Sequence, residues 1–414
     1  MTLAETLPLV SFCIPTFKRS RYLASLLECM TTELAEFPYS YEIVIADNAS
    51  PDDTQDVVRS FEERLPIRYS RHESNIGGYP NWQFVMSQAI GTYIVYVSDD
   101  DSILGHQVAG TIAKMEADPE IVVVYAPWLM FDLVAQQKQG QFYDVPHDLR
   151  IARDNHAQLL DSILRHHIFP EIQITRRSAF TATMPRINEH AFLAFMHASD
   201  YLTKGAVLIQ KEPFYVAITR YFADETREQL GNDEVEHAWD RYRGGLEYML
   251  GRTGVPITAE ERSGFHLRVQ QMIALRMSVA IRLRHHKKRN AIDTYYLAMR
   301  LRGLGYENYL PVPLAQLAGD AILEFLMNDP EIRRGKRQMV CVGITGPEER
   351  AYFSREAGMP VEYVADLDDC EKLSDALVFV RHTAIAAKRI DSAQAARRNV
   401  RILLEHDLAS KFRA

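Results

Sequence analysis

Three consecutive aspartates, Asp99 to Asp101, come one residue after the apolar stretch Ile94–Val97. Carboxylates this close repel one another, and each costs free energy if it leaves water without a partner. Clustered carboxylate oxygens suit Mg²⁺ or Mn²⁺, which need only one or two of them beside the phosphates of a substrate. A divalent cation also neutralises the charge that grows on a departing diphosphate. The cluster therefore indicates metal-assisted chemistry on a phosphate compound; the alternative is a solvated acidic turn in which one aspartate caps the next helix.

Two other polar clusters follow apolar stretches that have the length of buried strands. PTFKR (15–19) comes after Leu9–Ile14, and DNAS (47–50) closes Glu42–Asp47. Continuous apolar strands that alternate with helices predict a mainly parallel sheet with both faces covered. Such sheets bind ligands just beyond the carboxyl ends of their strands. The three clusters are far apart in the sequence, but we expect them to meet in one crevice.

The pattern of strand–helix–strand units continues to about residue 130 and returns near the C-terminus. In the first part, further strands are expected at 67–70 and Ile121–Ala126, and helices at Arg21–Leu34, Thr54–Leu65, 81–90 and 107–117. The region 131–232 is less regular, with a strand at Gly205–Gln210, and the spacing of apolar residues from 233 to 305 is helical. The last part predicts strands at 338–344, 360–366 and 376–380, and helices at 347–358 and 392–408.

The composition is that of a soluble globular protein, with 47% hydrophobic and 25% charged residues in a chain of 414, long enough for two or three domains. The net charge of −8 gives no reason to expect a nucleic-acid partner. Four scattered cysteines without a CxxC pair argue against a disulfide framework or a zinc site and favour the cytoplasm. The start is no secretory signal, and no apolar run approaches the roughly 20 residues of a membrane span.

Basic residues are concentrated between Arg262 and Arg302, where ten lysines and arginines stand against one acid, Asp293. Two interpretations fit this window. It is either a solvated helical face that pairs with acids elsewhere, or a patch that rests on the anionic inner face of the plasma membrane or grips a phosphate-bearing acceptor.

The common nucleotide-binding motifs are missing: neither GxxxxGK[ST] nor GxGxxG follows the first strand. Instead, VSFCIPTFKRSRYLASLLECM (10–30), YEIVIADNASPDDTQDVV (41–58) and NIGGYPNWQFVMSQAIGTYIVYVSDDDSI (75–103), in this order, resemble the family 2 glycosyltransferases of the GT-A fold. The resemblance is strong over about 8–130, weaker to 222 and absent afterwards. It implies an α/β fold with a mainly parallel sheet, a nucleotide-diphosphate sugar donor, Mn²⁺ or Mg²⁺, and transfer with inversion to a glycan or lipid-linked acceptor.

The resemblance also implies roles for individual residues. The nucleoside would lie on Pro15, Thr16 and Phe17 and hydrogen-bond to Asp47 or Asn48, where the family commonly has two acids. Asn48 departs from that pattern, but its carbonyl can still accept the bond. The loop with Asn75, Gly77 and Gly78 would lie beside the nucleotide, since glycines let backbone approach a phosphate. Asp99 would bind ribose or metal and Asp101 metal, and Asp100 could replace either because three acids in a row leave the register open.

Inverting transfer needs a general base that deprotonates the acceptor hydroxyl. The family keeps an acid near the start of a helix that precedes a strand, and MHASDYLTKGAVLIQKEPFY (196–215) fits that outline, with Asp200 as the expected base. A helix-capping role for Asp200 is the alternative. ITRYFAD (218–224) keeps Arg220 of a family element but lacks its histidine.

We therefore predict a GT-A domain over 1–232, with a nucleotide half (1–130) and an acceptor half (131–232), a basic helical region over 233–310 and a small α/β domain over 311–414. The expected function is sugar transfer in the synthesis of a surface polysaccharide or glycoconjugate. Two alternatives stay open. One is an inactive transferase domain that serves as a binding or scaffold protein. The other is a nucleotidyltransferase, which is disfavoured because PTFKR lacks the glycines that its first loop would need.

Overall fold

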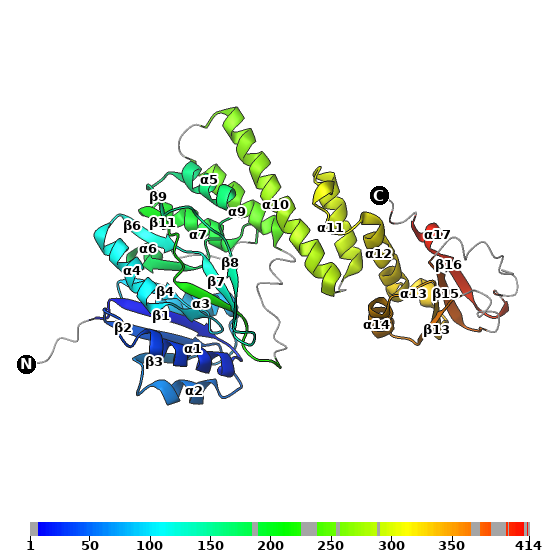
Figure 1. The fold of residues 1–414 in the computed structure, drawn as a ribbon, viewed down its shortest axis with the longest axis horizontal. Coiled ribbons are helices and arrows are strands. Elements are labelled where there is room, and N and C mark those ends of the chain that lie inside the picture. Colours follow the sequence, from blue (N-terminus) through cyan, green and yellow to red (C-terminus); the bar gives the residue numbers. More distant parts are fainter. Residues whose placement is uncertain are drawn as a thin grey trace, which may run out of the picture. The chain divides into compact units, whose positions relative to one another are not determined.

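The structure, a computed structural model, describes residues 7–183, 189–224, 238–253, 257–287, 290–365, 373–381, 395, 397–409 and 412 (Figure 1). The chain divides into two compact units, one with Met1–Gln229 and Asp240–Met272, the other with Leu230–Trp239 and Ile273–Ala414. This division differs from the three predicted domains, because the helical region does not stand alone but is shared between the two units. The expected boundary at 232/233 lies outside the described residues.

Eight of the described strands form the central sheet of the first unit, in the order β3-β2-β1-β4-β10-β6-β11-β9. Strands β1 to β4 are parallel, β10 runs antiparallel between β4 and β6, and β9 is an antiparallel edge strand beside β11. The mainly parallel sheet expected from the sequence is confirmed. Their bounds are β1 Val10–Thr16, β2 Tyr41–Asp47, β3 Ile67–Arg71, β4 Tyr93–Tyr96, β6 Ile121–Tyr125, β9 Leu149–Ile151, β10 Gln173–Arg176 and β11 Ala206–Ile209.

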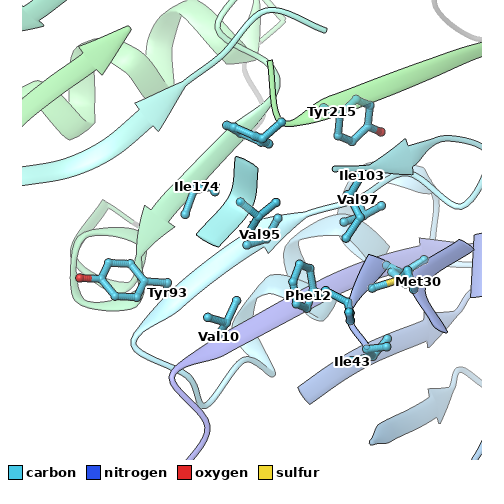
Figure 2. Close-up of a cluster of buried hydrophobic side chains, with 14 of the residues drawn as sticks. Val10, Phe12, Met30, Ile43, Tyr93, Val95, Val97, Ile103, Ile174 and Tyr215 are labelled. Carbon is cyan, nitrogen blue, oxygen red and sulfur yellow. The ribbon is translucent and has the colours of Figure 1, made fainter. Parts of the chain in front are cut away.

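Helices pack on both faces of this sheet, which is why its central strands are apolar without alternation. One face forms a single core in which Phe12, Ile43 and Val95 meet Met30 of α1 (Figure 2). Helices α2 and α4 add to the same core, while α3 contacts β1 and β2, and α7 contacts β6 and β11. The described helices of this unit are α1 Ser20–Glu33, α2 Thr54–Phe61, α3 Gly78–Ser87, α4 Gly105–Ala117, α5 His156–His166, α6 Arg177–Thr183, α7 Leu193–Leu202 and α9 Trp239–Gly251 (from Asp240 onward), followed by the first half of α10 Ala259–Lys287.

A second sheet of the first unit begins directly after the aspartate triplet. Its order is β5-β12-β7-β8, with β5 at Ser102–Ile103, β12 at Tyr215–Arg220, β7 at Trp128–Asp132 and β8 at Gln137–Gln141. Tyr215 pairs with Ile103 and Val216 with Ser102. This pairing brings β12 beside the triplet although more than a hundred residues separate them in the sequence.

The second unit contains a four-stranded parallel sheet in the order β14-β13-β15-β16, with β13 at Gln338–Val342, β14 at Val361–Val364, β15 at Ala376–Val380 and β16 at Arg401–Leu404. Its described helices include the end of α10, then α11 Ala291–Gly303, η1 Glu307–Tyr309, α12 Leu314–Asn328, α13 Pro330–Arg333, α14 Pro347–Glu356 and α17 Glu405–Ala409. The helix predicted over 392–408 is wrong at 401–404, where the backbone pairs with β15 instead, so that tertiary pairing overrides the local helical pattern.

Charged side chains meet at the carboxyl edge of this second sheet. Arg381, directly after β15, forms ion pairs with Glu349 at the start of α14 and with Glu405 after β16 (3.6 Å to the latter). All three are largely buried, and a Cβ atom at Gly319 of α12 would lie 3.0 Å from the guanidinium of Arg381. Across the described part of the chain, no helix combines the length and the apolar character that crossing a membrane requires.

Candidate active site

The loops after β1 and β2 are tied to each other at the carboxyl edge of the central sheet. The backbone N–H of Lys18 donates to the hydroxyl of Ser50 (3.0 Å), and the backbone N–H of Ser50 donates to the carboxylate of Asp47 (2.8 Å). The backbone N–H of Asn48 donates to the carbonyl of Thr16 (2.9 Å). Lys18 has a positive φ of 56°, which turns the chain sharply before α1. Hydrogen bonds therefore join two of the three predicted polar clusters, PTFKR and DNAS, at the carboxyl edge of the sheet.

Asp47 is fully buried, and both of its oxygens have partners. Besides Ser50, it accepts a hydrogen bond of 2.6 Å from the hydroxyl of Tyr69 and lies 3.3 Å from Nε of Arg71, both on β3. A second N–H group of Arg71 donates to the carbonyl of Ser50. These partners fix β3 and the loop after β2 to each other. Asp47 itself is shielded from solvent, whereas Arg71 is half-exposed.

Asn48 positions the loop that contains Asn75 and Gly77. Its side-chain carbonyl accepts a hydrogen bond from the backbone N–H of Ile76 (2.8 Å), and its amide donates to the side chain of Asn75 (2.9 Å). That side chain also accepts from the backbone N–H of Gly77 (2.8 Å). Gly77 has φ 95° and ψ 154°, a conformation that is essentially restricted to glycine. The loop expected beside the nucleotide is therefore held by Asn48, one of the two residues expected to hydrogen-bond to the base.

Asp99 and Asp100 converge on one guanidinium, that of Arg19. The same nitrogen, Nη1, lies 3.2 Å from Oδ1 of Asp99 and 2.6 Å from Oδ2 of Asp100. The other oxygen of Asp100 accepts from the hydroxyl of Ser98 (2.6 Å). Arg19 immediately precedes α1, so the loop after β1 brings a cation to the end of β4. All three polar clusters predicted from the sequence thus meet, as expected.

Asp101 points away from its neighbours and towards β12. Its Oδ2 accepts a hydrogen bond from the hydroxyl of Tyr215 (2.8 Å), and its Oδ1 accepts from the backbone N–H of Ile218 (2.9 Å). The hydroxyl of Tyr221 donates to its backbone carbonyl (3.1 Å). These contacts join the two sheets of the first unit, and they separate Asp101 from the pair that faces Arg19.

Electrostatics distinguish Asp99 within the triplet. Its pKa is raised to about 6, first by burial and then by the charge of Asp100, while Arg19 acts in the opposite direction. Two carboxylates share one guanidinium, so the pair keeps an excess negative charge in a poorly solvated place. A divalent cation would remove that excess and keep Asp99 ionised, so the donor set fits Mg²⁺ or Mn²⁺. Among the described residues, no group of three histidine, cysteine or acidic side chains could hold a metal ion by itself.

Asp200 is not among the residues that the structure brings together. It lies in the last turn of α7, not near the start of the helix. Its carboxylate accepts from the hydroxyl of Tyr248 on α9 (2.9 Å) and pairs with Arg252, which directly follows α9. β11 begins at Ala206, whose N–H donates to the carbonyl of Glu120, just before β6. Asp200 is therefore close to the amino edge of these strands, opposite the edge that holds the triplet. This geometry favours a structural role over the predicted role as general base.

The remaining predicted residues lie where the clusters meet. Pro15 and Thr16 end β1, and Thr16 is buried. Phe17 is half-buried, and Lys18 lies against its ring (5.0 Å from Nζ to the ring centroid). Gly78 begins α3, and a Cβ atom there would meet nothing within 4 Å.

Three contributors to the site are absent from the sequence-based set: Arg19, Arg71 and Tyr215. Arg19 belongs to the PTFKR cluster, which was expected to meet the aspartates, so its position near them could have been predicted from the sequence. For Arg71 and Tyr215 the sequence has no such signal, because each is an ordinary residue of a strand and its partner is set by strand pairing.

Comparison with known proteins finds a matching family and relatives for the N-terminal part of the chain. Residues 11–182 match the model of the family described as Glycosyl transferase family 2. The chain is 35% identical over 115 residues to the abequosyltransferase RfbV of Salmonella typhimurium, which is 27% of this chain and 34% of that protein. It is 30% identical over 95 residues to the poly(ribitol-phosphate) beta-N-acetylglucosaminyltransferase TarS of Staphylococcus aureus, which is 22% of this chain and 16% of that protein.

The chain thus spans about a third or less of the length of these relatives. A solved structure of TarS residues 1–349 from S. aureus in complex with UDP-GlcNAc aligns with 73% of this chain and 89% of that one, at 15% identity and a TM-score of 0.43.

Proposed function

The first unit of this chain belongs to glycosyl transferase family 2, and from this premise we propose that the protein transfers a sugar from a nucleotide-diphosphate donor to a hydroxyl acceptor. The main support is the convergence of three loops at the carboxyl edge of the sheet, where parallel α/β sheets bind ligands. The names of the two relatives describe sugar transferases, so synthesis of a surface polysaccharide or glycoconjugate is the proposed setting.

In this proposal, each loop has a separate task. The nucleoside lies against Phe17, beside Asn75 and Gly77, whose glycine backbone leaves room for a phosphate. Asp47 and Asn48 act mainly by holding that loop and Arg71 in place, because their oxygens already have partners. The half-exposed guanidinium of Arg71 is then the group that reaches a base or ribose.

We assign the divalent cation to Asp99 and Asp100, whereas the sequence predicted Asp99 and Asp101. Oxygens of Asp99 and Asp100 lie close enough to share one cationic group, while both oxygens of Asp101 accept hydrogen bonds from β12. When bound, Mn²⁺ or Mg²⁺ would stabilise the charge of the leaving diphosphate. Asp101 supports this function by fixing the triplet to β12.

Transfer with inversion, which the family resemblance implies, is part of the proposal. It needs a base close to the acceptor hydroxyl. Asp200 was predicted for this role, but its position at the opposite edge and its ion pair with Arg252 make it a weak candidate. We therefore leave the base unassigned and propose the reaction on the donor side.

The basic window 262–302 supports membrane contact less strongly than its charge suggests. Arg268 pairs with Asp161 (2.5 Å), Arg284 is buried beside Asp293 (3.6 Å), and Arg302 pairs with Glu307 (3.4 Å). These contacts match the first of the two interpretations, a helical face that pairs with acids. Contact of the remaining basic residues with an anionic membrane or a lipid-linked acceptor stays a proposal, which co-sedimentation with vesicles containing phosphatidylglycerol would test against neutral vesicles.

The proposed function is tested by measuring sugar-nucleotide hydrolysis by the full chain over a panel of UDP-, GDP-, CDP- and dTDP-sugars, with Mn²⁺, with Mg²⁺ and with EDTA. We expect hydrolysis of one donor or a few related donors that depends on the cation. Titration calorimetry on the same panel addresses the alternative of a binding or scaffold protein. Tight, cation-dependent binding without turnover of any donor, even when candidate acceptors are added, would favour the scaffold over the enzyme.

A further inference from the structure

Arg19 occupies the place that the proposed cation needs, and this overlap points to a role in metal binding. We propose that Arg19 is an exchangeable counter-ion. Its guanidinium holds Asp99 and Asp100 while the donor site is empty, and it moves to the donor diphosphate when nucleotide and cation bind. As a result, nucleotide and cation bind more tightly together than separately. This inference rests on the proposed function, because it requires a cation at the two aspartates and a diphosphate beside them.

The geometry of the ion pair supports the exchange. A single nitrogen of Arg19 contacts both carboxylates, 3.2 Å from Oδ1 of Asp99 and 2.6 Å from Oδ2 of Asp100. The second oxygen of Asp100 is held by Ser98. A cation between the two carboxylates therefore competes with the guanidinium for the same oxygens, and both cannot be held there without repulsion between the positive charges.

The backbone of Arg19 is anchored on both sides, while part of its side chain reaches solvent. Lys18 before it is held by Ser50, and the backbone N–H of Ser20 after it donates to the carboxylate of Asp52 (3.2 Å). The Arg19 side chain is 20% exposed, compared with 5% for Asp99. In this proposal the guanidinium, which is more exposed than Asp99, is the group that moves, while the anchored loop and the buried carboxylate of Asp99 stay in place.

A diphosphate is the natural second partner for this guanidinium. Arginine has five N–H donors in a planar fork that matches phosphate oxygens, and the contacts to the aspartates use only one of its nitrogens. Without a diphosphate, a cation that displaced Arg19 would leave a half-buried guanidinium without an anion. With a diphosphate, that cost disappears, so the nucleotide raises the affinity for the cation. Linkage requires the cation to raise the affinity for the nucleotide by the same factor.

The test measures binding of Mn²⁺ to the full chain by electron paramagnetic resonance of the free ion, without nucleotide and with saturating UDP or GDP. For the wild type, we expect weak binding of Mn²⁺ alone and an affinity at least about 10-fold higher with one of the nucleotides, a typical size for coupling between sites. Arg19→Gln removes the competing charge. It should bind Mn²⁺ alone several-fold more tightly than the wild type, and the nucleotide should then raise its affinity only slightly.

Arg21→Gln is the matched control, because Arg21 lies two residues away on α1 but is 63% exposed and pairs with Asp224 (3.8 Å) instead of the triplet. It should behave as the wild type does. Arg19→Lys keeps the charge and protects the test against misfolding of the glutamine variant. It should bind Mn²⁺ alone as weakly as the wild type does, because an ammonium still competes for the carboxylates, while the nucleotide effect decreases because lysine lacks the planar fork.

Two results would overturn the exchange. In the first, Arg19→Gln folds but binds Mn²⁺ alone no more tightly than the wild type does. In the second, the nucleotide raises the Mn²⁺ affinity of Arg19→Gln as much as it raises that of the wild type. If the glutamine variant does not fold, Arg19→Lys with an unchanged nucleotide effect has the same meaning. A different result, no Mn²⁺ binding by the wild type with any nucleotide, would refute the proposed metal-dependent function itself. Failure of the exchange alone would leave that function standing.

Discussion

The hydroxyl of Tyr215 donates a 2.8 Å hydrogen bond to the carboxylate of Asp101, from a position 114 residues further along the chain. The tyrosine is fully buried, and its ring is part of the core of the first unit (Figure 2). The same hydroxyl accepts from the backbone N–H of Ser98 at 3.1 Å. One core residue thus fixes the orientation of the turn that contains all three aspartates, and this is why the three carboxylates have different surroundings.

Asp100→Asn and Asp101→Asn should therefore fail in different ways. Asp100→Asn removes a charge that faces Arg19, so we expect turnover to drop by at least about 100-fold, the lower end of what one electrostatic contact contributes to catalysis, with little change in melting temperature. Asp101→Asn weakens the bonds to Tyr215 and Ile218, so we expect a loss of about 1–3 kcal/mol in the free energy of unfolding. Hydrolysis assays and urea unfolding measure the two effects.

Tyr215→Phe serves as the control for Asp101, since it removes the same hydrogen bond from the other side and should lower stability without removing a carboxylate. If Asp101→Asn abolished turnover while stability stayed unchanged, the assignment of the cation to Asp99 and Asp100 would be wrong.

Gly77→Ala should damage the nucleotide loop through its backbone. The conformation at Gly77, φ 95° and ψ 154°, is strained for alanine by about 1–3 kcal/mol, so the loop should shift and the affinity for nucleoside diphosphates should fall. Gly78→Ala is the matched control, because a Cβ atom at Gly78 meets nothing within 4 Å and the residue begins a helix. Calorimetric binding of UDP and GDP to both variants is the measurement. Equal losses in the two would contradict the argument.

Asp200→Asn should keep most of the turnover. Asp200 and Arg252 are both partly exposed, so replacing the carboxylate should cost only roughly 1 kcal/mol of stability. Arg252→Gln should cost a similar amount, and the double variant should be less destabilised than the sum of the two, because both changes break the same contact. A loss of turnover in Asp200→Asn with intact donor binding would restore Asp200 as the general base.

His197 should make the protein less stable in mild acid. It is buried on α7 against Trp82 (5.8 Å between ring centroids, 21° between the planes), and burial lowers its pKa to about 3. The unfolded chain takes up this proton near pH 6.5, so the contribution of neutral His197 to stability is complete above that pH and is lost as the pH falls towards 3.

At pH 5 the loss from this one group amounts to roughly 2 kcal/mol relative to pH 7.5. His197→Phe keeps an aromatic ring at this position and cannot titrate. Urea unfolding at both pH values should show a smaller decrease for the variant than for the wild type, whereas equal decreases would mean that His197 is accessible to protons in the folded state.

The strands and helices of the first unit are readable because each strand is a continuous apolar run that ends in polar residues. β1, β2, β4 and β6 are buried on both faces, so their sequences consist mostly of apolar residues. The meeting of the three polar clusters follows from the same rule, since parallel strands end at one edge. The sequence does not reveal that β10 lies antiparallel between β4 and β6, because strand order depends on tertiary pairing.

The orientation of individual side chains in the site was not predictable. Asp99, Asp100 and Asp101 stand in a turn, where no period determines which way a side chain points, and their partners are distant in the sequence. The motif that suggested Asp200 has the right order of helix and strand, but the position along the helix depends on where α7 begins, and Asp200 falls in its last turn. A pattern of this kind locates an element more reliably than it locates one carboxylate.

The pairing of Arg381 with Glu349 and Glu405 makes the carboxyl edge of the second unit's sheet different from that of the first unit's sheet. At the edge where a parallel sheet would usually receive a small molecule, this sheet is occupied by its own ion pairs, with α12 close against them. A visiting ligand would have to break these contacts before it could form any of its own. Changes at this edge should therefore alter how well the unit survives heat or proteases, and leave the choice of sugar untouched.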